Sequence, residues 1–177
     1  PLTPCSFDYT VYGPRHASLR CYRNRRAVLF SIRYLSEAGN SAPFPVFTLY
    51  PRNLGHITFS GMFAHPTFGY FAGESPWVFF DPAGTSFIIS PASNFMTAVT
   101  GGIAAKGIYS SISPQIATLP EGFEHGTLLV VEDGINRAFE TWGSTLNALA
   151  GVMRPANDAD LILNRIGYWT DAGATDY

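Results

Sequence analysis

The chain has 177 residues, of which 46% are hydrophobic and 14% are charged, and its formal net charge at pH 7 is −2. This length is sufficient for one domain with a hydrophobic core, and a nearly balanced charge gives no electrostatic basis for binding nucleic acid or a membrane surface. No apolar run approaches the roughly 18 residues of a membrane-spanning helix. Because the charged share lies well below the typical value of about 25%, we expect part of the surface to be covered.

Residues 1–132 predict an antiparallel β-sandwich, because short apolar runs alternate with turns rich in Gly, Pro, Asn and Ser. The segment His16–Arg26 is expected to be a basic turn. Three of the apolar runs, Trp77–Phe80, Phe87–Ile89 and Leu128–Val131, are continuous rather than alternating, so the sheet should be covered on both faces. The expected strands are Cys5–Tyr12, Ala27–Leu35, Pro45–Pro51, His56–His65, Thr67–Ala72, Pro76–Asp81, Ser86–Ala92, Asn94–Thr100, Gly102–Ile112 and Gly126–Glu132.

The pattern changes after Glu132, where the period of the apolar residues becomes helical. A helix is predicted from Asn136 to about Ala150, and its buried face should carry Phe139, Trp142, Leu146 and Leu149. Gly151 is a suitable end signal, and Pro155 prevents continuation of the helix. A short capped helix within Asn157–Arg165 and a new strand, Ile166–Trp169, should follow. The chain therefore divides into a sandwich (1–132), linker helices (133–164) and the start of a second domain (165–177).

No motif in the sequence predicts a catalytic residue, a metal or a cofactor. The histidines have no metal-binding spacing, and Cys5 and Cys21 form no Cys-x-x-Cys pair. The segment Thr100–Gly107 is similar to a phosphate-binding loop but lacks the Gly-Lys-Ser/Thr ending, so a turn is expected there. The four histidines, expected to be surface or core residues, are His16, His56, His65 and His125.

Two pairs of residues each allow two interpretations. Glu132 and Asp133 are candidates for an acid/base pair, but at a strand-to-helix junction they can equally stabilise the helix dipole. Cys5 and Cys21 form either a disulfide or two buried thiols. A disulfide would indicate an oxidising compartment and hence a secreted or extracellular protein.

The last strand ends in a candidate ligand-binding loop. Asp171 follows the predicted strand directly, and Trp169 shares its face because strand side chains alternate. The ends of barrel strands commonly carry ligand-contacting groups, and a carboxylate beside an aromatic ring suits a sugar. The alternative is an ordinary turn at Thr170–Gly173.

Ile135–Leu146 (INRAFETWGSTL) and Asp158–Tyr177 (DADLILNRIGYWTDAGATDY) resemble the domain junction of the α-galactosidase and raffinose-synthase superfamily of glycoside hydrolases. Gly167–Asp171 (GYWTD) is similar to the first barrel strand of those enzymes, and more closely to a glycosidase-like group in which GYWTDNGA opens the barrel. This chain departs from that pattern at Ala172, where the group has Asn, and at Thr175–Asp176, where it has tyrosines.

The resemblance implies an antiparallel β-supersandwich, a linker helix and the first strand of an incomplete (β/α)8 barrel. On this hypothesis the chain is the N-terminal part of a glycoside hydrolase or transglycosidase. Its partner would be the remainder of the same protein, possibly as a separate chain, and its ligand a carbohydrate. Trp169 and Asp171 would contact substrate, whereas the catalytic carboxylates would lie on later strands, outside this chain. The alternative is a stand-alone β-sandwich that binds carbohydrate or has a structural role.

Overall fold

The computed structural model describes residues 6–10, 13–22, 25–39, 43–47, 54–61, 65–68, 71, 74–103 and 107–167. These residues are mainly β, with antiparallel pairing throughout, and contain one α-helix, α1 (Ile135–Ala150), and a 3-10 helix, Leu161–Asn164. The strands are β1 (Ser6–Thr10), β2 (Arg15–Tyr22), β3 (Ala27–Tyr34), β4 (Ala38–Gly39), β5 (Val46–Phe47), β6 (Gly55–Ser60), β7 (His65–Thr67), β8 (Glu74–Phe80), β9 (Thr85–Pro91), β10 (Ala98–Ile103), β11 (Gly107–Ile112), β12 (Thr118–Leu119) and β13 (Glu124–Asp133).

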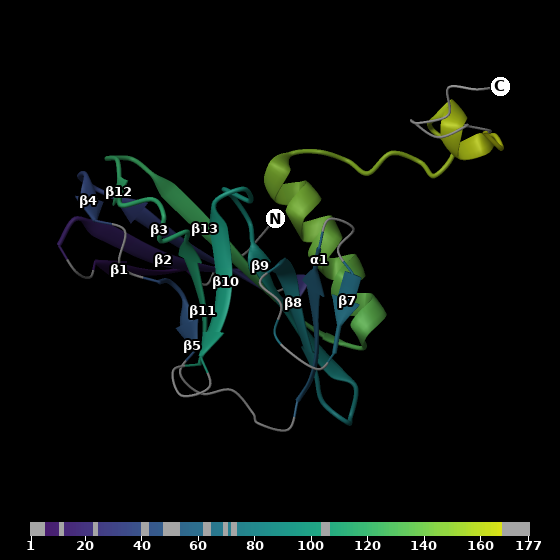
Figure 1. Cartoon of the computed structure of the whole chain (residues 1–177), viewed down its shortest axis with the longest axis horizontal. Coiled ribbons are helices and arrows are strands. Elements are labelled where there is room, and N and C mark those ends of the chain that lie inside the picture. The colour runs from purple at the N-terminus through teal and green to yellow at the C-terminus, as the bar shows by residue number, and fades with distance from the viewer. Residues whose placement is uncertain are drawn as a thin grey trace, which may run out of the picture.

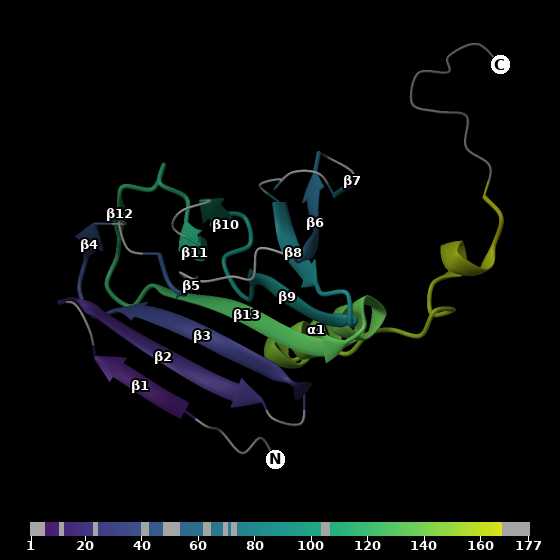
Figure 2. The same cartoon turned by 90° about the horizontal axis from the view of Figure 1, so that it is seen from below.

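The main sheet has eight strands in the order β1-β2-β3-β13-β9-β8-β6-β7. A second sheet, β10-β11-β5, lies over one of its faces, and the two-stranded sheet β12-β4 lies beside it (Figures 1 and 2). Helix α1 packs on the opposite face, against β13, β9 and β3. The fold is therefore a β-sandwich whose larger sheet carries a helix on its outer side, which confirms the sandwich predicted for this part of the chain.

The central strands are buried on both faces, as the continuous apolar runs predict. Val78 and Ile88 pack with Ala138 of α1, and all three side chains are fully buried. Their neighbours Trp77 and Ile89 point to the other face and pack with Ile108 of β11. Adjacent residues of one strand thus serve two different cores, because side chains alternate across a strand.

The predicted basic turn at His16–Arg26 is wrong. Arg15–Tyr22 forms strand β2, which pairs with β3 over its whole length. Of the predicted turn, the described residues between the two strands are Arg25 and Arg26, and Arg26 has a positive φ of 44°. The positive charge at Arg20 concealed the strand. Arg20 is exposed, although Tyr22, two residues later on the same face, is buried in one cluster with Leu128 and Val130 of β13.

The predicted helix is confirmed and begins one residue earlier, at Ile135. Phe139, Trp142 and Leu146 pack against the sheet, but the prediction that Leu149 is buried is wrong. Leu149 lies in the last turn and belongs to none of the buried clusters of the described residues. The helix ends at Gly151, which has the left-handed φ of 68° that favours glycine.

Trp142 links the helix to the sheet by a hydrogen bond as well as by packing. Its Nε1 donates to the hydroxyl of buried Ser90 at 2.7 Å. Trp142→Phe keeps most of the packing and removes the donor, so we expect it to lower the free energy of unfolding by about 1 kcal/mol. Urea denaturation of Trp142→Phe, Ser90→Ala and the double variant tests this, and strictly additive effects would show that the hydrogen bond contributes nothing.

The segment after Gly151 leaves the sandwich and projects from it (Figure 1). The predicted short helix is present as the 3-10 helix Leu161–Asn164, and the Oδ1 atom of Asp160 caps it by accepting a hydrogen bond from the Ile162 amide at 2.8 Å. Ile166 and Gly167 belong to no strand. The rest of the predicted barrel strand, from Tyr168 onward, lies outside the described residues.

Candidate functional site

The two predicted sugar-contacting residues, Trp169 and Asp171, lie outside the described residues. The last described residues before them are Ile166 and Gly167, and Ile166 is fully exposed. The described part of the segment therefore leads away from the sandwich rather than into one of its surfaces. The role of Trp169 and Asp171 stays a prediction.

Cys21 is disulfide-bonded. It lies on β2 opposite Val28 of β3. Cys5, the other cysteine of the sequence, lies outside the described residues, so its pairing with Cys21 stays a prediction.

The carboxylates of Glu132 and Asp133 are already engaged. Arg26 forms ion pairs with Glu132 at 3.3 Å and with Asp133 at 2.8 Å. Glu132 also accepts a hydrogen bond from Thr141 of α1 at 2.9 Å. The hydrogen bond from Arg26 and its positive charge lower the pKa of Asp133. In turn, the hydrogen bond to Asp133 and the charges of Asp133 and Glu132 raise the pKa of Arg26. A carboxyl group that is held ionised in this way is a poor proton donor, so the geometry favours a role in joining the strand to the helix over an acid/base pair.

A shallow cleft of about 430 Å³ lies where α1 begins. The helix starts after Gly134 without a side-chain cap, which leaves backbone N–H groups of the first turn available. The cleft contains no pair of nucleophile and base, and the hydroxyl of Ser86 donates to the carbonyl of Gly84 at 3.3 Å. Its lining residues are Phe80, Gly84, Ser86, Asp133, Gly134, Ile135, Asn136 and Arg137.

Ser110, His125 and Thr127 form a polar network between the two sheets. The Thr127 hydroxyl donates to Ser110 Oγ at 2.7 Å, and Ser110 Oγ lies 3.2 Å from His125 Nε2. A serine beside a histidine is the arrangement of a nucleophile and its base. All three side chains are buried, however, and His125 is only 2% exposed, so a substrate cannot reach them. We therefore interpret the network as part of the core.

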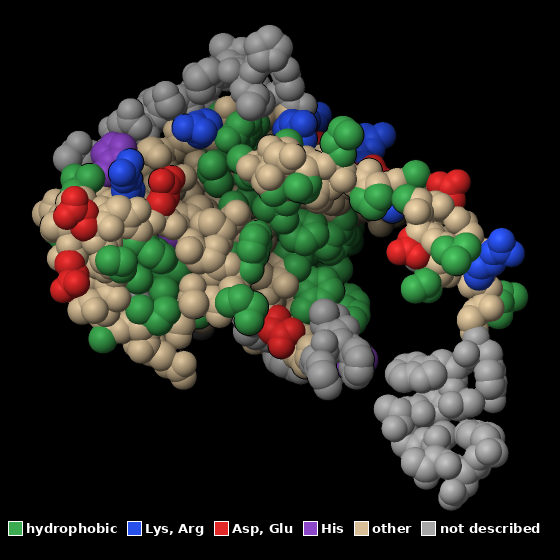
Figure 3. Space-filling view, turned by 90° about the horizontal axis from the view of Figure 1, so that it is seen from above, with side chains coloured by type: hydrophobic (Ala, Val, Ile, Leu, Met, Phe, Trp, Pro, Cys, Tyr) green, Lys and Arg blue, Asp and Glu red, His purple; other side chains and the backbone are tan. Residues whose placement is uncertain are grey.

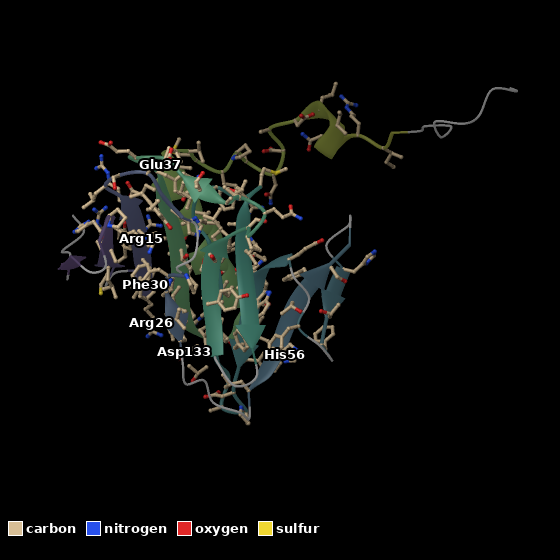
Figure 4. The ribbon with its side chains drawn as sticks, turned by 60° about the vertical axis from the view of Figure 1, so that its left-hand side comes forward. Arg15, Arg26, Phe30, Glu37, His56 and Asp133 are labelled. Carbon is tan, nitrogen blue, oxygen red and sulfur yellow. The ribbon has the colours of Figure 1, made fainter. Side chains whose placement is uncertain are left out.

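A second feature that the sequence pattern did not predict is an aromatic cluster near the β7 edge. The half-exposed ring of Phe71 stacks on His56 at 4.4 Å and on Trp77 at 5.0 Å between ring centroids. His56 Nε2 and Trp77 Nε1 are both buried without a hydrogen-bond partner. The cluster closes this end of the core; Figure 4 shows His56 well apart from Arg26 and Asp133.

No cofactor site is evident in the part of the chain that the structure describes. There, no three His, Cys, Asp or Glu side chains gather as a metal site would require. The one α-helix in the same part is too short and too polar to cross a membrane.

Comparisons with family models, with curated protein sequences and with solved structures gave no match for this chain. The class that fold and geometry define is thus a mainly β, antiparallel sandwich with a helix on its outer face.

Proposed function

We propose that this chain is the N-terminal sandwich of a carbohydrate-active enzyme, a glycoside hydrolase or transglycosidase, and that it supports a catalytic (β/α)8 barrel. The sandwich is a scaffold in this proposal, and the loop that carries Trp169 and Asp171 contributes to the sugar site. Catalytic carboxylates belong to the barrel. The disulfide at Cys21 supports an oxidising, extracellular location.

The observation that carries the proposal is the projecting segment Val152–Gly167. It begins where the helix leaves the sheet, and Met153, Ile162 and Ile166 are each more than 80% exposed. Large apolar side chains are rarely left in water along a whole segment. A following domain would cover them, and the resemblance of Gly167–Asp171 to a first barrel strand supports a barrel as that domain.

A stand-alone carbohydrate-binding or structural sandwich is the second candidate function. The exposed ring of Phe71, supported from below by His56 and Trp77, favours it. The two candidates differ in what covers the projecting segment, since a stand-alone module offers no barrel to do so.

The test of the site is Asp171→Asn in the protein extended through the domain that follows. We expect binding to 4-nitrophenyl glycosides to weaken by about tenfold, which corresponds to one lost charge-assisted hydrogen bond, while some turnover remains. Asp158→Asn is the matched control, because this exposed carboxylate lies in the same segment and away from the predicted loop. Wild-type affinity in Asp171→Asn would remove Asp171 from the site.

A further inference from the structure

A rigid turn on the sandwich presents two large apolar side chains to solvent. In this turn, Asn94–Thr97, Phe95 is 62% exposed and Met96 is 97% exposed. Asn94 has a positive φ of 54°, and its carbonyl accepts hydrogen bonds from the amides of Thr97 and Ala98, both at 2.9 Å. The turn is therefore held in one conformation by its own backbone.

The turn is also anchored to the main sheet. The Gly126 amide donates to Ser93 Oγ at 2.8 Å, and Ser93 Oγ donates to Asn94 Oδ1 at the same distance. Side chains that a rigid element presents lose little conformational freedom on binding. Phe95 and Met96 are thus well prepared to act as anchors of an interface, where aromatic residues and methionine are enriched.

More exposed apolar residues lie at the same end of the molecule. Ala92, just before the turn, and Leu146, in the last part of α1, are partly buried and pack against the same buried cluster, so the turn and the last part of the helix lie at the same end of the main sheet. Figure 3 looks onto this end and shows hydrophobic side chains gathered beside the start of the projecting segment. We call these residues the apolar end surface: Phe95, Met96, Leu149, Val152 and Met153.

The sequence around the turn is almost free of charge. Between Ser86 and Pro120, Lys106 is the only charged residue. Charged residues are depleted in the core of protein interfaces, whereas a sheet face that stays in water needs them to remain soluble. The charge pattern therefore fits a protein surface as the occupant.

We infer that the apolar end surface is the docking site for the domain that follows the projecting segment in the same protein. This inference rests on the proposed function and adds the place of contact. The chain leaves the sandwich at this surface, and the 16 residues Val152–Gly167 are the tether. A short tether keeps the following domain at a high effective concentration, so a modest apolar surface is sufficient for docking.

Trypsin provides the test, because Arg165 is exposed and is followed by Ile166, whereas Arg154 is protected from trypsin by Pro155. In the chain ending at Tyr177 we expect rapid cleavage after Arg165. In the protein extended through the following domain, docking should protect this bond. The double variant Phe95→Ser/Met96→Ser should raise the cleavage rate of the extended protein by at least about tenfold, since the docked domain would lose its contacts with two apolar side chains.

The control is Phe68→Ser, which removes an equally exposed phenylalanine (63%) next to β7, remote from the turn. It should leave the cleavage rate unchanged. An unchanged cleavage rate in the double variant would overturn the inference. So would light scattering that shows dimers of the chain ending at Tyr177 and monomers of the same chain with Phe95→Ser/Met96→Ser, because the surface would then bind a second copy. Failure of the proposed function would give a different result. Protection of the bond after Arg165 would still depend on Phe95 and Met96, but the extended protein would not bind glycosides.

Discussion

Trp77→Ala is expected to lower the free energy of unfolding by about 3–5 kcal/mol, the range for truncating a large buried aromatic side chain. Trp77 is 2% exposed and packs with Phe79, Ile89 and Ile108 between the two sheets. Its indole also leaves no spare room on the side of β10, because a Cβ at Gly102 would lie 3.1 Å from Cζ3. Rigid strands on both sides prevent collapse of the cavity, so most of the volume would stay empty.

Trp77→Phe separates packing from polarity. The Nε1 group of Trp77 is buried without a partner, and such a group destabilises the folded state. Phenylalanine removes it together with part of the ring, so the cost should be less than half that of alanine. Urea denaturation measures both variants. Equal losses in the two variants would contradict this account, because they would assign the stability to the Nε1 group rather than to the volume of the ring.

The sequence predicts the core strands and the helix well because each repeats one local pattern. Continuous apolar runs such as Trp77–Phe80 require burial on both faces, and the structure buries them in two cores. The helix follows equally from its period and from Gly151. Strand β2 was missed because its arginines resemble a basic turn. Arg15 and Arg20 lie on opposite faces of the strand, so no alternating pattern marks it, and only the pairing with β3 shows that it is a strand.

Contacts between distant strands could not be predicted from local patterns. Gly101 of β10 lies opposite Tyr109 of β11, whose ring occupies the space where a Cβ would stand. Gly55 and Phe80 repeat this arrangement between β6 and β8. Such glycines resemble turn signals in a sequence, and only the register of the pairing shows that they accommodate a ring.

The candidate functional residues also differ in whether a local sequence pattern could identify them. The sequence identifies Trp169 and Asp171 from one strand-end motif, and this stays a prediction. The apolar turn at Phe95 and Met96 carries no sequence motif, and its significance depends on exposure in the folded chain. Sequence reasoning assigned Asn94–Thr100 to a strand, although the strand begins only at Ala98, because the apolar side chains in the turn imitate a strand.

His125 should make the protein sensitive to acid before its carboxylates do. Burial lowers the pKa of His125 from 6.5 to about 4, and the nearby backbone of Ser93 offsets only part of this effect. The ring is therefore neutral in the folded protein, with Nε2 facing the hydroxyl of Ser110 at 3.2 Å. Nδ1 is buried without a hydrogen bond of ordinary geometry. Protonation would place a charge between the sheets, and among the described residues no carboxylate forms an ion pair with this ring.

The direction of the effect follows from the two pKa values. Above pH 6.5 the histidine is neutral in both the folded and the unfolded chain, and it contributes no pH dependence. As the pH falls from 6.5 to about 4, His125 binds a proton in the unfolded chain but stays neutral in the folded protein. The free energy of unfolding therefore decreases over this interval. The difference between the two pKa values corresponds to about 3 kcal/mol at pH 4. The pKa of Asp133 is lowered by Arg26, so its contribution is lost at still lower pH.

His125→Gln isolates this term, because glutamine keeps a polar group beside Ser110 but does not titrate. The variant should be less stable than the wild type at pH 7, and the difference should shrink by about 3 kcal/mol on going to pH 4. The other three histidines, His16, His56 and His65, are the same in both proteins. Urea denaturation across this interval measures the difference directly. A constant difference would mean that His125 titrates normally in the folded protein, and the interpretation of the Ser110–His125–Thr127 network as a dry part of the core would have to be abandoned.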